Sequence, residues 1–314
     1  MSPVVESRAK GFDETTLSGA DSRAAVRSGA AAGSPLSRLF ERVQGTFLLP
    51  ATVFIALFLI PPFLFVFVTS FYDQGWSLDA YRKFFGGQLF LRSFVNTITI
   101  GATTAMTATA LGYVVAYHLA KCSPRRRAIY LILVMLPFWT SVLVKSFAFV
   151  VILGTSGVIN TLIKAVLGAG TGVPMIFNRT GVIIGLTHWL LPFAVFPILS
   201  SLLAQDRMLP VAAEVMGAGR FRIFWTIEFR QSLPGVVASA LMVAVISMGS
   251  FVTPALLGGR GDIMMANLVD FYIREALDWR MASAIAVILV SFAALLLIAL
   301  LSIKGSTNAL RTLR

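Results

Sequence analysis

Cysteine and histidine are scarce in this 314-residue sequence, which contains one Cys and two His. The single thiol, Cys122, cannot form an internal disulfide, and no H-E-x-x-H motif is present. We therefore expect no metal site and no redox chemistry. A G-x-x-x-x-G-K-[ST] phosphate loop is also missing, so we expect neither an ATPase site nor a cofactor bound by this chain.

Charged residues are scarce as well, at 13% of the sequence, whereas 57% of the residues are hydrophobic and the mean hydropathy is +0.83. A soluble domain of this length could not bury so much apolar surface. The net charge of +12 comes from basic residues that lie between long uncharged stretches and form no stripe with aromatic residues. This pattern argues against a nucleic-acid partner and predicts an all-α integral membrane protein in contact with lipid.

Five stretches without a charged residue exceed the roughly 20 residues needed to cross a bilayer. A sixth apolar stretch begins at Ala128 and is interrupted by Lys145, whose ammonium we expect to snorkel to the membrane surface. The predicted transmembrane helices are about 47–71, 94–119, 128–153, 181–204, 236–258 and 281–303. They form one predicted transmembrane domain, 45–305.

Basic residues are distributed unevenly between the segments that join these helices. The N-terminal tail, 120–127, 205–235 and the C-terminal tail hold 17 of the 26 Lys and Arg residues. By the positive-inside rule, these segments and both termini are predicted to be cytoplasmic. Residues 1–44 are rich in Ala, Ser and Gly and are predicted to be disordered, and 306–314 form a C-terminal tail. The first apolar run is too long for a cleaved signal peptide.

Proline occurs inside several predicted spans, where each Pro removes a helix hydrogen bond. The prolines are Pro50, Pro61, Pro62, Pro137, Pro192, Pro197 and Pro254. Two interpretations remain open: simple kinks in a helix bundle, or broken helices that line a translocation path.

An intramembrane serine hydrolase is the alternative function class. It depends on Gly154-Thr155-Ser156-Gly157, with Ser156 as nucleophile and His188 as base. The same four residues also suit a turn after a helix end, and His188 also suits a packing role.

The segment 205–235 predicts a short helix that begins near Pro210, which suits a first helical turn, and ends at Gly217 or Gly219, either of which suits a helix end. A helix of two turns is not stable alone in water, so its apolar face predicts a protein partner; a loop that lies on the membrane surface is the alternative. The segment also resembles the coupling loop of type I ABC importer permeases, with its pattern E-A-A-x-x-x-G and, ten residues later, I-x-L-P. The residues that carry the resemblance are Ala212, Ala213, Gly217, Ile227, Leu233 and Pro234. Val211 replaces the Glu of the pattern, Glu214 lies three residues on, and Phe229 and Arg230 replace Leu-Pro.

Four further stretches are similar to spermidine/putrescine-type permeases, so that the resemblance covers roughly 45–305. They are 136–141 followed by Lys145, 190–193 with Pro197 beyond, 249–259 and 267–279. The resemblance implies a six-helix permease fold with a cytoplasmic coupling helix in the bacterial inner membrane. It also implies three partners: an ATPase dimer that binds the ATP, a second homologous permease, and a periplasmic substrate-binding protein.

A polyamine is the first substrate that the resemblance implies, and opines and aminophosphonates are alternatives. Polyamines are polycations, which carboxylates and aromatic faces would hold. The candidate path residues are Phe138, Trp139, Lys145, Phe251, Thr253, Asp270 and Asp278. The same acidic residues could instead be solvated or contact the binding protein.

Overall fold

A computed structural model describes residues 35–72, 75–168 and 172–311, and its named elements are all helices. The chain divides into two compact units, 1–64 and 65–314. The first unit contains most of α2 (Pro35–Phe71), which includes Pro50, Pro61 and Pro62. Since α2 begins at Pro35, the predicted disordered tail is wrong for 35–44, and its remainder, 1–34, lies outside the described residues.

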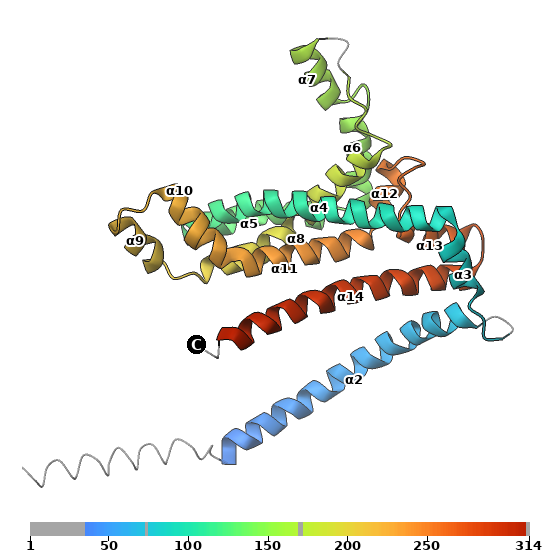
Figure 1. Cartoon of the computed structure of the whole chain (residues 1–314), viewed down its shortest axis with the longest axis horizontal. Coiled ribbons are helices and arrows are strands. Elements are labelled where there is room, and N and C mark those ends of the chain that lie inside the picture. The colour runs from blue at the N-terminus through green and yellow to red at the C-terminus, as the bar shows by residue number, and fades with distance from the viewer. Residues whose placement is uncertain (1–34, 73–74, 169–171, 312–314) are drawn as a thin grey trace, which may run out of the picture. The chain divides into compact units, whose positions relative to one another are not determined.

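The second unit is a helix bundle (Figure 1). Its elements are α3 (Asp79–Gly86), α4 (Gln88–Lys121), α5 (Pro124–Trp139), α6 (Val142–Leu153), α7 (Val158–Leu167), α8 (Arg179–Leu203), α9 (Met208–Val215), α10 (Arg220–Ile223), η1 (Phe224–Glu228), α11 (Phe229–Met248), α12 (Val252–Leu257), α13 (Met265–Arg274) and α14 (Trp279–Arg311). Because α14 runs to Arg311, residues 306–311 of the predicted C-terminal tail are helical, and 312–314 lie outside the described residues.

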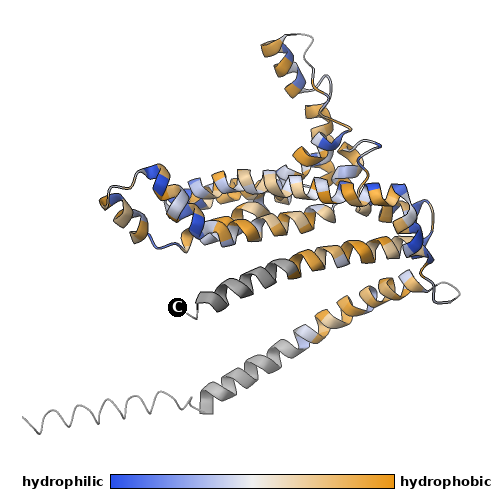
Figure 2. Cartoon of the chain, viewed as in Figure 1, coloured by the Kyte–Doolittle hydropathy of each residue, from blue (hydrophilic) through white to orange (hydrophobic). Residues whose placement is uncertain are grey.

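Six helical stretches in the described residues are long and apolar enough to cross a membrane. They are Thr52–Phe71, Gln88–Lys121, Val142–Leu167, Arg179–Leu203, Arg220–Met248 and Trp279–Ile298. Hydrophilic residues gather at the two ends of the bundle, around α9 and α10 and around α3 and α13 (Figure 2). The predicted all-α membrane fold is therefore confirmed. The third and fifth predicted helices differ from those in the structure.

The third predicted helix, 128–153, is wrong as one continuous element. It is broken into α5 and α6 at Thr140 and Ser141, whose backbone is extended (ψ 145° and 136°). Pro137 has already removed one hydrogen bond from the last turn of α5. In Figure 1, α6 and α7 leave the line of α5 at a steep angle.

The fifth predicted helix, 236–258, is wrong at both ends. Helical structure begins at Arg220, passes through the π-helical turn η1 and ends at Met248. Gly249 and Ser250 interrupt it before the short helix α12. Pro254 therefore lies in the first turn of a new helix, where its missing N–H costs nothing.

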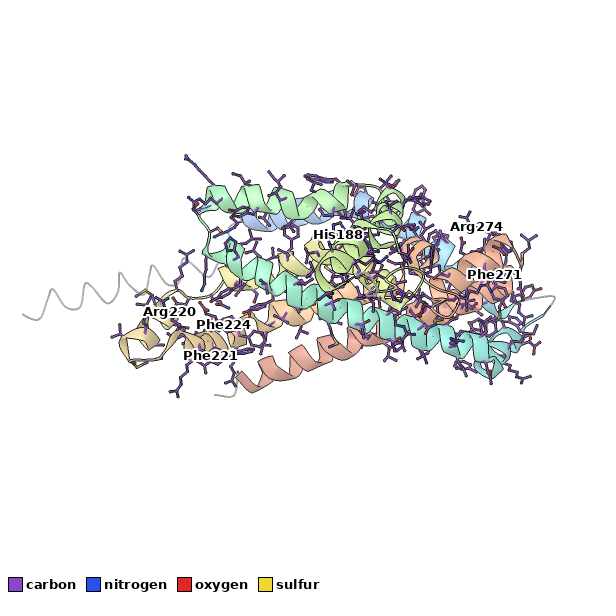
Figure 3. The ribbon with its side chains drawn as sticks, turned by 90° about the horizontal axis from the view of Figure 1, so that it is seen from above. His188, Arg220, Phe221, Phe224, Phe271 and Arg274 are labelled. Atoms are coloured by element: carbon purple, nitrogen blue, oxygen red, sulfur yellow. The ribbon has the colours of Figure 1, made fainter. Side chains whose placement is uncertain are left out.

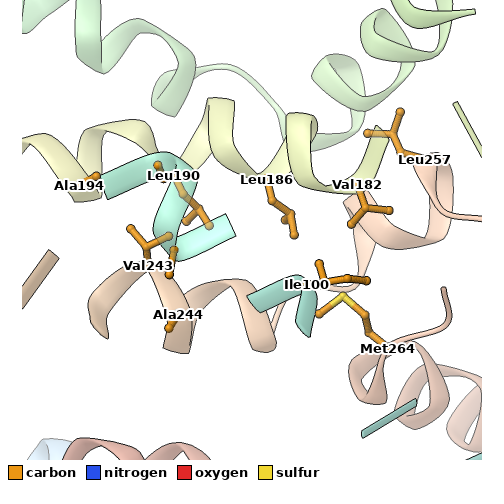
Figure 4. Packing of buried hydrophobic residues seen from close by; sticks show 11 residues of the cluster. Ile100, Val182, Leu186, Leu190, Ala194, Val243, Ala244, Leu257 and Met264 are labelled. Carbon is orange, nitrogen blue, oxygen red and sulfur yellow. The ribbon is translucent and has the colours of Figure 1, made fainter. Parts of the chain in front are cut away.

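The core lies between α4, α8 and α11. Its centre is formed by Ile100, Leu186, Leu190 and Val243, which are fully buried (Figure 4). Small residues let the backbones approach: a Cβ on Gly112 of α4 would lie 2.8 Å from the Cβ of Ala194. Such close helix packing is typical of membrane bundles, in which van der Waals contact drives helix association.

A polar cluster around the buried Asn96 ties α4 to α8 at the end of the bundle opposite α9. The amide of Asn96 donates to the carbonyl oxygens of Gly261 (2.7 Å) and Ile263 (3.2 Å). Arg179 Nη2 donates to Asn96 Oδ1 at 2.7 Å, and Arg179 Nε lies 3.4 Å from Asp262 Oδ1. These contacts fix the 259–263 turn against both helices.

Candidate functional site

The segment between α8 and α11 contains the short helix that the sequence predicts. The backbone N–H of Met208 donates to Asp206 Oδ1 (2.9 Å) at the start of α9, and Pro210 lies in its first turn. The helix ends at a left-handed Gly217 (φ +83°), and the N–H of Ala218 reaches back to the carbonyl oxygen of Ala213 (3.0 Å). This αL ending explains the preference for glycine at 217.

The α9–α10 segment, 208–223, presents apolar side chains to the outside. Val215, Met216 and Phe221 are 84%, 81% and 79% exposed. Phe221 and Arg220 lie at one end of the bundle and Phe271 and Arg274 at the other (Figure 3).

The residues predicted for the coupling loop fall into two groups in the structure. Ala212, Ala213, Glu214 and Gly217 lie on α9 and its ending turn, where Ala213 is buried and the other three are exposed. Ile227, Leu233 and Pro234 lie in η1 and α11, so the second half of the predicted loop is helix. Open space surrounds Gly217, because no atom lies within 4 Å of a Cβ placed there.

A cleft of about 720 Å³ opens beside this segment. It is lined by the end of α4, the start of α5 and the 202–210 stretch, with Lys121, Arg127, Asp206, Arg207 and Glu228 as its charged residues. Sequence reasoning missed Glu228 and its partner on α4, Tyr117. The available signal was an acidic residue placed between Trp225 and an apolar helix.

Part of the candidate path gathers at the break between α5 and α6. Phe138 and Trp139 end α5 and are both exposed. Lys145 Nζ donates to the carbonyl oxygen of Pro137 at 2.5 Å and lies 5.9 Å from the centre of the Trp189 ring. Lys145 therefore contacts the carbonyl end of α5, and it lies in the first turn of α6 rather than near the end of one continuous helix. The snorkelling role stays a prediction.

The other candidate path residues lie elsewhere. Thr253 is buried in α12, and Phe251 is half-exposed just before that helix. Asp270 pairs with Arg274 on the next turn of α13 (2.6 Å).

The carboxylate of Asp278 caps α14 by accepting the N–H of Met281 (2.9 Å). Asp270 and Asp278 therefore have local structural partners, and the structure does not assemble the seven candidates into one site.

The predicted hydrolase pair is not assembled either. Ser156 is exposed in the turn between α6 and α7, and His188 packs edge-on against Phe149 of α6 with ring centres 5.2 Å apart. Within the described residues, no hydrogen bond joins Ser156 to His188. The same part of the chain contains no cluster of three or more His, Cys, Asp or Glu residues that could hold a metal ion.

Comparison with curated proteins finds permeases that match most of the chain. The spermidine/putrescine transport system permease protein PotB of Haemophilus influenzae is 29% identical over 73% of this chain and 80% of its own length. PotB of Escherichia coli K12 is 28% identical over 78% of this chain and 91% of its own length. The ferric transport system permease protein FbpB of Actinobacillus pleuropneumoniae is 22% identical, and the match covers 80% of this chain but 36% of that protein.

Among solved structures, a bacterial alginate ABC transporter in complex with an alginate-bound periplasmic protein contains a chain of the same fold. The TM-score is 0.65 at 18% identity, and the match covers 82% of this chain and 92% of that one. The family model for the binding-protein-dependent transport system inner membrane component matches residues 108–307, a range that runs from α4 into α14 and includes the α9–α10 segment. A match over this much of the chain shows that the protein belongs to that family of transport permeases.

Proposed function

We propose that this chain forms half of the translocation path of an ATP-driven importer, in which the α9–α10 segment docks on a separate ATPase subunit. The observation that carries the docking is the exposed apolar surface of that segment at Val215, Met216 and Phe221. Apolar side chains grouped on a short helix outside the bundle lose contact with water when a protein cleft receives them. In this arrangement the ATP is bound by the partner, and this chain needs no cofactor of its own.

The partners and orientation follow from the same proposal. A second homologous permease completes the path, and a periplasmic binding protein delivers the substrate at the α13 end. The basic residues around α9 and the 120–127 turn favour the cytoplasm for the α9 end and for both termini.

The broken helix supports a path beside α5 and α6. Non-helical backbone at membrane depth is tolerated where it is covered by protein or lines water. Thr140 and Ser141 are extended and exposed in this chain. We therefore place the second permease or the water-filled path against this break.

A polyamine is the proposed substrate, since the two PotB relatives are named for spermidine and putrescine. Phe138 and Trp139, exposed beside the break, offer aromatic faces to an alkylammonium group. Uptake of labelled putrescine and spermidine, with an opine and an aminophosphonate as competitors, tests this assignment. Uptake of the opine or the aminophosphonate, without uptake of either polyamine, would overturn it.

Substitutions at Gly217 test the docking. Gly217→Arg adds bulk where no atom of this chain lies, so its effect reports on a partner. Gly217→Ala is the matched control, because it shares the strain of a positive φ without the bulk. We expect Gly217→Arg to abolish co-purification with the ATPase and uptake, and Gly217→Ala to retain most of both.

Two more variants complete the series. Glu214→Ala should weaken ATPase association by about 1 kcal/mol, the range of an exposed ion pair. Ser156→Ala should leave uptake unchanged. Normal uptake in Gly217→Arg would refute the docking, and loss of uptake in Ser156→Ala would revive a catalytic role for that serine.

A further inference from the structure

A largely buried carboxylate joins η1 to the end of α4 at the base of the α9–α10 segment. The side chain of Glu228 is 18% exposed. Its Oε2 accepts a hydrogen bond from the Tyr117 hydroxyl (2.6 Å), and its Oε1 lies 3.7 Å from Lys121 Nζ. Tyr117 and Lys121 are one turn apart on α4, so both contacts tie η1 to the last turns of that helix.

A second bond closes the base of the segment. Gln205 Nε2 donates to the backbone carbonyl oxygen of Glu228 at 2.8 Å. Gln205 precedes α9 and Glu228 follows α10, so the two ends of the segment are clasped together. We name Tyr117, Lys121, Gln205 and Glu228 the Glu228 joint. Within the joint, Lys121 also donates to the Tyr117 hydroxyl, and its ammonium lies 4.0 Å from the centre of that ring.

The π-helical turn η1 makes this geometry possible. Its hydrogen bond runs from the N–H of Phe229 to the carbonyl oxygen of Phe224, five residues earlier. In an α-helix, residues five apart would point about 140° away from each other. The wider turn instead brings Phe224 and Phe229 to the same side, where their rings lie 6.1 Å and 5.4 Å from that of Tyr113.

Aromatic contacts alone would hold η1 to α4, so the carboxylate needs a separate explanation. Removing a charged group from water is costly, and an apolar replacement of a buried ion pair is often equally stable. What the ionic contacts add is directionality, because a hydrogen bond at 2.6 Å allows little rotation or sliding between Glu228 and Tyr117. The joint therefore fixes the angle between the segment and α4.

We propose that Glu228 is a positioning residue that makes the α9–α10 segment move as one body with the end of α4. A displacement imposed on the segment by the ATPase is then delivered to α4, which packs along α8 and α11 in the core. The inference rests on the proposed docking of this segment. It adds the residues through which that docking would act on the membrane helices.

Two variants break the joint without removing the aromatic packing. Tyr117→Phe removes one hydroxyl, and Glu228→Gln removes the charge that faces Lys121 but keeps the side-chain length. Tyr113→Phe is the matched control, since it lies one turn away on α4 and loses a single hydrogen bond donated by Ser232 (3.2 Å).

The first measurement is hydrogen exchange of the whole chain in lipid nanodiscs, without partners. We expect the amides of 205–228 to exchange about tenfold faster in Tyr117→Phe and Glu228→Gln, and at the wild-type rate in Tyr113→Phe. The effects of the two substitutions should not add in the double variant, because they act on one hydrogen-bonded network.

The second measurement is putrescine uptake per ATP hydrolysed, with the ATPase, partner permease and binding protein reconstituted in proteoliposomes. We expect both variants to co-purify with the ATPase and to hydrolyse ATP, with uptake per ATP reduced about tenfold. Lys121→Met should lower the uptake per ATP hydrolysed. Lys121→Arg, which keeps the charge, should retain most of the wild-type ratio.

Unchanged exchange in Tyr117→Phe would overturn the joint, as would an unchanged uptake ratio in a working complex. Loss of co-purification in both variants would also overturn it, because Glu228 would then act in assembly. A wild-type complex that imports no putrescine would refute the proposed substrate, and the exchange measurement would still decide whether the joint holds the segment.

Discussion

Replacing Asn96 should destabilise the bundle more than any change to the ion pair beside it. Asn96→Ala removes two hydrogen bonds to the carbonyl oxygens of Gly261 and Ile263 and one from Arg179. Net values of about 1 kcal/mol for each neutral bond and about 2 kcal/mol for the charge-assisted one give a loss of about 4 kcal/mol. On the scale of domains of comparable size, this corresponds to a fall in Tm of about 10 °C.

The assay is thermal unfolding of the purified chain in detergent, followed by near-ultraviolet circular dichroism. Asp262→Asn is the control, because it removes a partly exposed ion pair to Arg179 and leaves Asn96 bonded. That variant should lose 1 kcal/mol or less. Equal Tm values for Asn96→Ala and the wild type would refute the view that this cluster holds α4 and α8 to the 259–263 turn.

Three further predictions concern packing, the helix break and topology. Gly235→Ala should lower the Tm by several degrees because its Cβ would lie 2.5 Å from Ser201 Cβ, whereas Gly219→Ala, in open space, should leave it unchanged in the same melting assay. Lys145→Met should also lower the Tm, since the carbonyl of Pro137 loses its charged donor and keeps only the hydrogen bond from the Thr140 hydroxyl (3.0 Å); an unchanged Tm would favour a snorkelling side chain. In intact cells, an impermeant thiol reagent should fail to label Cys122, and labelling would reverse the proposed orientation.

The short helix α9 could be predicted from the sequence because its signals are local. Pro210 suits a first turn and Gly217 or Gly219 suits an ending turn; in the structure Pro210 lies in the first turn and Gly217 ends the helix. The six apolar stretches follow from hydropathy and length, which depend on composition alone.

The break at Thr140 and Ser141 could not be predicted in the same way. Pro137 indicates a kink, but many membrane helices continue past a proline. Here α6 packs against α12, a partner more than a hundred residues later, and this tertiary contact sets the new direction.

The Glu228 joint could not be predicted from the sequence either. Nothing in 220–235 alone indicates a π-helical turn, because the residues that favour it are Tyr113 and Tyr117 on α4.

Asp278 is a different case. An acidic residue directly before an apolar helix is a recognisable N-cap signal, and it could have been separated from the candidate path at the start.

The exposed backbone between α5 and α6 has a consequence for how the stability of this protein is defined. With 16 residues, α5 is about 24 Å long, which is shorter than the hydrocarbon core of about 30 Å. The non-helical backbone at Thr140 and Ser141 is therefore exposed to hydrocarbon unless another molecule covers it. The folded state of this chain then gains free energy from its neighbour by mass action, so its midpoint of unfolding should rise with the concentration of the assembled complex.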